Sequence, residues 1–279
     1  MKKIALLLSI PIMIFSCGDA EQDSKHQEKQ EEQTKQDDII EESVERKNVL
    51  LPSPLQIGMV LNNAGLSYED GLTHDVSRHK DYMTSTSKWL NFGVYSADMA
   101  YCVINEQSQP AMDIMKVIKD LGEDLGLQSI FSSEDLLTSF ENNLNNRDSL
   151  IYIITTIQEE LDEYSDKNDM QDERVIAFTG AWVEFVYLGT NVVTTDDNIS
   201  IKIMEQMVVL ENIINGLEAA NSKDSQLQDI HTELVELQEY FNSLIDEEED
   251  EDMYDLEVNE EILNEIKTKI EKTRNLIIQ

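Results

Sequence analysis

The chain has 279 residues, among them 57 aspartates and glutamates against 21 lysines and arginines, and its formal net charge is −36. A polyanion of this size repels the phosphate backbone and anionic membrane surfaces, which excludes nucleic-acid binding as a main function. The same charge favours solubility and the attraction of divalent or basic partners.

The first 16 residues have the layout of a secretory signal peptide. Two lysines, Lys2 and Lys3, precede an apolar segment over residues 4–15. This segment is shorter than the roughly 20 apolar residues that span a bilayer, and positive residues ahead of a short apolar stretch are typical of a signal peptide. We therefore predict that residues 1–16 are removed from the mature protein.

The signal peptide leads into the sequence IFSC, whose cysteine is Cys17. An apolar residue, a variable residue, a small residue and a cysteine in this order resemble the lipobox of bacterial lipoproteins. The resemblance implies that cleavage falls before Cys17, that its thiol is diacylglycerated and that its new amine is often acylated too. Two or three acyl chains, at about 0.8 kcal/mol per buried CH₂, form a stable membrane anchor where one chain does not. The alternatives are an incidental cysteine in a plain secretory signal and an N-terminal transmembrane anchor.

The second cysteine, Cys102, lies among apolar residues and has no partner for an internal disulfide once Cys17 is lipidated. An unpaired thiol in such surroundings is most often a small buried hydrophobic side chain. The fold is therefore expected to form without a disulfide.

Residues 17–48 are predicted to be a disordered acidic tether behind the lipidated cysteine. Residues 18–48 contain 11 acidic and 5 basic residues, many glutamines and almost no apolar residue before Ile39. Such a segment cannot bury enough apolar surface to offset the entropy of ordering. At about 5–6 Å times the square root of the residue number, its typical reach is roughly 30 Å, which holds a domain clear of the lipid headgroups.

An acidic cluster just behind the cysteine, formed by Asp19, Glu21 and Asp23, bears on the location. It resembles the charged export signals of some Gram-negative surface lipoproteins, and a generic solvated linker is the alternative interpretation. We therefore expect attachment to the outer membrane of the cell envelope, with the periplasmic face and the cell surface both open.

From residue 49 to residue 279 the pattern predicts one all-α domain, a multi-helix bundle or stacked antiparallel helical hairpins. Ser53 is a natural N-cap, Pro54 suits the first helical position, Gln56 completes a capping box and Gly65 offers a stop. No strict two-residue alternation persists, so no strand is expected. Further helices are predicted over about 84–106, 109–125 with Gly126 as its stop, a short segment capped by Ser132 or Ser133, 147–165 and 171–194.

The C-terminal third carries narrow apolar stripes at alternating spacings of three and four residues, the geometry of a bundle seam. The short link from Asn221 to Ser225 predicts that the first two of these helices pack as an antiparallel hairpin. The stripes are Ile203, Met207, Leu210, Ile214 and Leu217, then Leu227, Ile230, Leu234, Leu237, Phe241 and Leu244, and in the last helix Ile262, Ile266, Ile270 and Ile277.

Motifs for metal or cofactor chemistry are absent from the sequence, so no cofactor and no metal site is predicted. The acidic run over 246–252 lacks the alternating ligands and the glycine of a calcium-binding EF-hand loop, and the stretch that begins at Asp166 fails in the same way. His74 and His79 flank Asp75, which is too little for a zinc site. No Walker loop, dinucleotide fingerprint or nucleophile elbow occurs.

Polar side chains at helical spacing on two apolar segments form the candidate site. They are Asn91, Tyr95, Asp98 and Tyr101 on the first segment, and Glu184, Tyr187 and Asn191 on the second. A buried carboxylate is costly unless it is hydrogen-bonded or paired. We therefore predict a structural network that joins tyrosines to the two carboxylates and fixes helix register. A ligand pocket and a catalytic acid/base pair are the alternatives. Four small residues, Gly93, Ala97, Gly180 and Ala181, predict a close approach of the two helices.

The stretches GVYSADMAY and GAWVEFVYLGTNVV, with PSPLQI and NNRDSL, resemble an uncharacterised family of helical lipoproteins from Gram-negative bacteria over about residues 52–195. The resemblance implies a location and a helical fold, and no activity. We predict a lipid-anchored, non-catalytic helical interaction or binding module with an envelope protein as its partner. One alternative is a small-ligand-binding or hydrolytic protein with a cleft lined by Asp98 and Glu184. Another is a structural spacer that self-associates through the C-terminal stripes.

Overall fold

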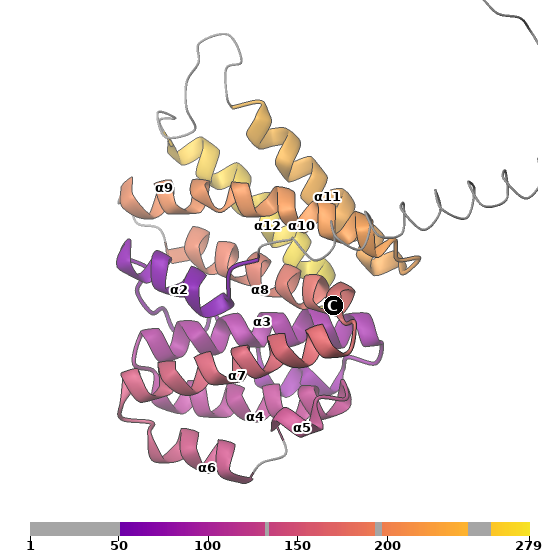
Figure 1. Ribbon diagram of the computed structural model, residues 1–279. Coiled ribbons are helices and arrows are strands. Elements are labelled where there is room, and N and C mark those ends of the chain that lie inside the picture. The colour runs from indigo at the N-terminus through magenta and orange to yellow at the C-terminus, as the bar shows by residue number, and fades with distance from the viewer. Residues whose placement is uncertain (1–50, 132–133, 193–196, 245–257) are drawn as a thin grey trace, which may run out of the picture. The chain divides into compact units, whose positions relative to one another are not determined.

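Helices make up the regular structure of the part of the chain that the structure describes (Figure 1). The structure is a computed structural model, and it describes residues 51–131, 134–192, 197–244 and 258–279. Over these residues no strand is present, which confirms the predicted all-α helical bundle. The elements are α2 (Pro54–Asn63), the 3₁₀ helix η1 (Val76–Lys80), α3 (Ser85–Ile104), α4 (Ser108–Asp124), α5 (Gln128–Phe131), α6 (Glu134–Asn142), α7 (Arg147–Lys167), α8 (Gln171–Val192), α9 (Asp197–Glu205), α10 (Met207–Ala220), α11 (Ser225–Asn242) and α12 (Glu260–Ile277).

Several sequence predictions fall outside the described residues and stay predictions. They are the signal peptide, the lipidation of Cys17, the acidic tether, the cap at Ser132 or Ser133 and the solvated acidic run over 246–252. The described helices all belong to one compact unit, Asn48–Gln279.

The N-terminus of α2 forms as its sequence predicts. The Ser53 hydroxyl accepts a hydrogen bond from the Gln56 amide at 3.2 Å, and the Gln56 side chain accepts one from the Ser53 amide at 2.9 Å. These two bonds complete the capping box and satisfy two backbone donors that the helix leaves free. Gly65, with φ of 115°, follows the C-cap, so the predicted stop is confirmed as well.

The pair formed by α3 and α8 is the centre of the bundle, and two glycines set its spacing. A Cβ added at Gly93 would overlap the carbonyl oxygen of Ala177, and one added at Gly180 would overlap the carbonyl oxygen of Leu90. The two backbones therefore touch without an intervening side chain, as the small residues predicted. In Figure 1, α8 lies between α3 on one side and α10 and α12 on the other.

Helix α8 is long and apolar enough, by length and composition, to cross a membrane, and among the described helices it alone meets that test. Inside the bundle 78% of its apolar stretch is buried. A helix that is apolar on all sides and enclosed by neighbours is the expected core of a multi-helix domain.

One prediction for the C-terminal third is wrong. The stripe from Ile203 to Leu217 does not lie on one helix, because α9 ends at Glu205 and α10 begins at Met207. At Gln206 the backbone tightens, and its amide donates to the carbonyl of Ile203, three residues back, at 3.1 Å. The stripe residues are nevertheless buried. Helix α11 packs against α10, as the short link predicted, and also against α12.

Candidate functional site

The two predicted carboxylates meet on one face of the α3–α8 pair. Asp98 of α3 and Glu184 of α8 each have 0% exposure, and α12 covers them. Arg274 of α12 binds Glu184 with two hydrogen bonds, Nε to Oε2 at 2.6 Å and Nη2 to Oε1 at 2.8 Å. The guanidinium carbon also lies 4.0 Å from the centre of the Tyr187 ring. A paired and stacked guanidinium of this kind compensates the desolvation of a buried carboxylate.

Asp98 is the second carboxyl of this cluster and differs from Glu184 in its partners. Its Oδ2 accepts a hydrogen bond from the His74 amide at 2.8 Å. Burial, and next the negative charge of Glu184, raise the pKa of Asp98 well above its usual value. Burial also raises the pKa of Glu184, while Arg274 opposes the rise. The environment therefore favours the protonated form of Asp98 more than that of Glu184, whose charge Arg274 stabilises. The other oxygen of Asp98, Oδ1, is buried and has no hydrogen-bond partner.

Two of the predicted tyrosines, Tyr95 and Tyr101, have hydrogen-bond partners other than the carboxylates, which corrects that part of the predicted network. The Tyr95 hydroxyl donates to the carbonyl of Asp75 at 2.8 Å. The Tyr101 hydroxyl donates to the carbonyl of Ser67 at 2.9 Å and accepts from the Glu69 amide at 2.7 Å. Both tyrosines therefore hold the connection between α2 and α3 against the face of α3.

His74 joins this connection to the buried cluster. Its Nε2 lies 2.5 Å from the Tyr82 hydroxyl, and its ring centre lies 5.2 Å from that of Tyr95. Burial lowers the pKa of His74 to about 4, because a charged imidazole would be desolvated here and Arg274 is nearby. The imidazole is therefore neutral at pH 7.

The two predicted asparagines have unequal roles. The Asn91 side-chain amide donates to the carbonyls of Ser87 and Ile277, each at 2.9 Å, so it ties the end of α12 to α3. The Asn191 amide donates to the carbonyl of Tyr187 within its own helix, at 2.9 Å. Asn191 therefore contributes nothing to the cluster.

The cluster is closed, so the geometry does not provide the cleft lined by Asp98 and Glu184 that was the alternative to a structural network. A catalytic carboxyl must come within hydrogen-bond reach of its substrate, and neither group has exposed surface. Arg274 belongs to this cluster and was not predicted from the sequence. Its signal was its position, four residues after Ile270, on the otherwise apolar stripe of α12.

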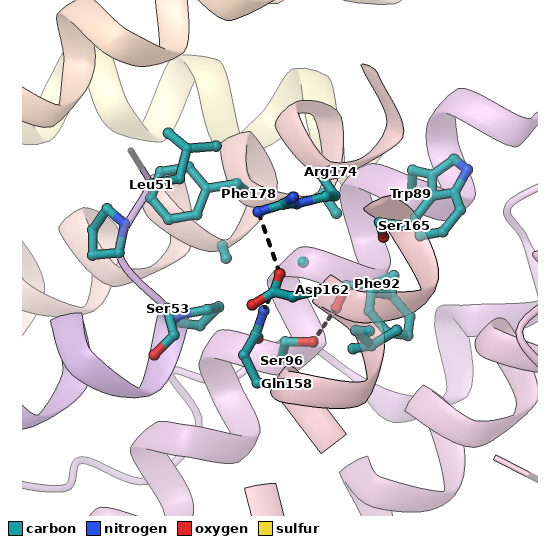
Figure 2. Close-up of a pocket in the computed structure, with 16 residues that line it drawn as sticks. Leu51, Ser53, Trp89, Phe92, Ser96, Gln158, Asp162, Ser165, Arg174 and Phe178 are labelled. Atoms are coloured by element: carbon teal, nitrogen blue, oxygen red, sulfur yellow. Dashed lines mark hydrogen bonds and ion pairs between the residues drawn. The ribbon is translucent and has the colours of Figure 1, made fainter. Parts of the chain in front are cut away.

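An open recess lies on another face of the α3–α8 pair, the face against which α7 packs (Figure 2). It has a volume of about 110 Å³ and is bordered by the segment before α2. Three helices contribute residues at spacings of three, four and seven, a pattern that could have been found in the sequence. The contributions are Trp89, Phe92, Gly93 and Ser96 of α3, Gln158, Leu161, Asp162 and Ser165 of α7, and Arg174, Ala177, Phe178 and Ala181 of α8.

The recess has an aromatic floor and a charged rim. Trp89, Phe92 and Phe178 are 5–7% exposed, so the floor is firmly packed. Figure 2 shows Arg174 pointing toward Asp162 across the recess, with 3.4 Å between Nη2 and Oδ1. The Gln158 amide donates to the same Asp162 oxygen at 3.3 Å. An apolar floor with a few hydrogen-bonding groups at its edge is the usual composition of a binding site.

The Ser96 hydroxyl donates to the carbonyl of Phe92 at 2.7 Å, so it is not activated as a nucleophile. Within the described residues, no group of three or more histidine, cysteine, aspartate or glutamate side chains could hold a metal ion.

Comparisons of the chain with protein-family models, with curated proteins and with solved structures found no match. The resemblance to helical lipoproteins over residues 52–195 therefore stays a prediction.

Proposed function

We propose that this protein is a lipid-anchored envelope lipoprotein whose helical domain is a non-catalytic binding module, and that the recess between α3, α7 and α8 is its docking site. The observation that carries the proposal is the contrast between the recess, which is open and apolar at its floor, and the carboxylate cluster, which is closed. The partner is an envelope protein that inserts an apolar side chain against Trp89, Phe92 and Phe178.

The charges of the recess and of the whole chain favour a partner with basic or neutral hydrogen-bonding groups beside that side chain. Asp162 faces the opening with its side chain 45% exposed, and the chain carries a net charge of −36. Complementary charge at the rim of an interface raises the association rate and rejects like-charged partners.

Two features argue against the alternative functions. The carboxylates that a hydrolytic or ligand-binding cleft would use have no exposed surface. The apolar stripes that a self-associating spacer would use are packed inside the domain, with Ile230, Leu234 and Ile266 at 0% exposure.

The anchor is tested by replacing Cys17 with alanine in the native host. The wild-type protein should fractionate with membranes, and its intact mass should equal residues 17–279 plus acyl chains, because Cys17 carries the lipid. Cys17→Ala should move to the soluble fraction. Cys102→Ala is the matched control, since this thiol is fully buried, and it should stay with the membranes. A Cys17→Ala protein that still fractionates with membranes would refute the lipid anchor.

The docking site is tested with a photo-crosslinking residue placed at Gln158, on the rim of the recess, in the anchored protein. The same residue at Tyr152, 73% exposed on α7 and outside the recess, is the control position. We expect one discrete crosslinked product from position 158 and none from position 152. Ala177→Phe, which fills the recess, should abolish the product, and Thr155→Phe on the exposed side of α7 should not. A product that Ala177→Phe leaves unchanged would contradict the assignment.

A further inference from the structure

A second cavity lies where the α3–α4 connection meets the start of α7, away from the recess. Its volume is about 240 Å³. It is lined by Val103, Glu106, Gln107, Ser108, Leu144, Asn145, Arg147 and Leu150. This size suits a molecule of a few carbon atoms and is below the range of about 300–1,000 Å³ typical of drug-sized ligands.

Arg147 is the unusual residue of this cavity. The structure describes four arginines, and three of them pair with carboxylates: Arg78 with Asp81, Arg174 with Asp162 and Asp166, and Arg274 with Glu184. Arg147 is the fourth, and it has no ion pair among the described residues. Its Nε is buried and has no hydrogen-bond partner. An unsatisfied buried donor is costly, and it is unexpected in a chain with so many carboxylates.

The free edge of Arg147 indicates which group would satisfy it. Within the same protein, Arg274 uses its Nε and Nη2 together to bind the two oxygens of Glu184. A planar carboxylate is the group that fits this edge of a guanidinium. The helices α4 and α7 both begin at this cavity, at Ser108 and Arg147, and their positive ends add to the attraction for an anion.

The remaining walls restrict the rest of the ligand. Glu106 lines the same cavity, is solvent-exposed and forms no ion pair with Arg147, so its carboxylate is available to a positively charged group of a ligand. Val103 and Leu150 are 1–2% exposed and form a packed apolar wall with Leu144. The cavity therefore combines a cation, an anion and an apolar surface.

We propose that this cavity binds a free α-amino acid with an apolar side chain. Its carboxylate pairs with Arg147, its ammonium group pairs with Glu106, and its side chain packs on Val103, Leu144 and Leu150. This site is separate from the recess and does not depend on the function proposed for it.

The inference is tested by titration calorimetry of the full-length protein with L-leucine, with 4-methylpentanoate, which lacks the ammonium group, and with 3-methylbutylamine, which lacks the carboxylate. L-leucine should bind saturably and more tightly than either analogue. Arg147→Gln should weaken L-leucine roughly tenfold or more, because a charge-assisted hydrogen bond is lost. Arg78→Gln, which removes a surface arginine, is the charge control and should bind as the wild type does.

A second variant separates the two ends of the ligand and does not depend on whether Arg147→Gln folds. Glu106→Gln should weaken L-leucine and leave the affinity for 4-methylpentanoate unchanged or higher. Saturable binding that neither variant changes would overturn the proposal, and so would the absence of saturable binding of L-leucine to the wild type. Equal affinity for L-leucine and 4-methylpentanoate would reject the amino-acid ligand and leave a simple carboxylate site.

Discussion

Two faces of the α3–α8 pair lie next to each other in the bundle and differ in what covers them. The face with Asp98 and Glu184 is covered by α12, whose Arg274 fills the space and pairs the charge. The face with Trp89 and Phe178 is covered by α7, which leaves a recess open. Charged residues on an apolar helix thus mark a closed structural cluster here. The open surface is formed by aromatic residues that the sequence did not single out, together with Gly93 and Ala181, which were expected only to allow a close approach of the two helices.

The largest expected loss of stability comes from a substitution that separates α3 from α8 and so disturbs both faces of the pair. Gly180→Ala places a Cβ against the carbonyl of Leu90, and because backbone atoms cannot rotate away, the helices must separate. We expect a loss of about 5 kcal/mol or more in the free energy of unfolding, the range reached when a core is strained. Urea unfolding followed by circular dichroism measures it.

Gly216→Ala is the matched control for Gly180→Ala, because the nearest neighbours of its Cβ are atoms of the Val175 side chain, not backbone atoms. Overpacking against a side chain costs about 1–3 kcal/mol. If Gly180→Ala costs no more than Gly216→Ala, the close backbone contact between α3 and α8 does not determine the spacing of the pair.

The next largest loss of stability is expected from substitutions in the closed carboxylate cluster alone. Glu184→Gln leaves Arg274 buried without its counter-ion, and loss of one member of a buried pair costs about 3–5 kcal/mol. The double variant Glu184→Gln with Arg274→Met should be more stable than Glu184→Gln, since it removes both charges. Asp98→Asn should cost only about 1 kcal/mol, because the neutral side-chain amide can still accept the hydrogen bond that the His74 amide donates. Equal losses in the free energy of unfolding for Asp98→Asn and Glu184→Gln would contradict a preference of the proton for Asp98.

A pH profile sharpens the description of the closed face. The folded-state pKa of His74 is about 4, below its ordinary value of 6.5. Between pH 6.5 and pH 4 the unfolded chain binds a proton at this site and the folded chain does not, so the contribution of His74 to stability is lost as the pH falls. Its full loss amounts to about 3 kcal/mol. The pH dependence is opposite for Asp98. Because its pKa is raised in the folded protein, its contribution to the free energy of unfolding falls as the pH rises above the ordinary aspartate range.

His74→Gln isolates the histidine contribution and keeps the backbone amide that binds Asp98. The wild type should lose more stability than this variant between pH 6.5 and pH 4, measured by urea unfolding at each pH. Tyr152→Phe, at a 73% exposed position on α7, retains the imidazole and its surroundings and serves as the control. Parallel profiles for the wild type and His74→Gln would show that the imidazole titrates normally in the folded protein.

The smallest effect on stability is expected at the open face. Arg174→Gln removes ion pairs to Asp162 and Asp166 whose carboxylates are 45% and 68% exposed. Exposed pairs contribute about 0–1 kcal/mol, so the free energy of unfolding should change by less than about 1 kcal/mol. The crosslink from position 158 should persist or become stronger, because the rim has lost a cation that would repel a basic partner and Asp162 is left without its ion pair. A large loss of stability would mean that the rim is structural.

The sequence by itself determined the helices and several of their ends. The capping box of Ser53 and Gln56 and the stop at Gly65 depend on neighbours within a few residues, so local chemistry decides them. The close approach of α3 and α8 at Gly93 and Gly180 was also predictable from the sequence, because residues without side chains on two apolar helices permit backbone contact.

Only the tertiary structure decided which polar groups meet and where space remains. Glu184 and Arg274 are separated by 90 residues, and their pairing depends on where α12 packs. The recess exists because α7 crosses α3 and α8 without filling the volume between them, and that volume is a property of three packed helices together. Local sequence fixes hydrogen bonds over one helical turn, whereas ion pairs between distant segments and the cavities of a bundle depend on the relative placement of whole elements.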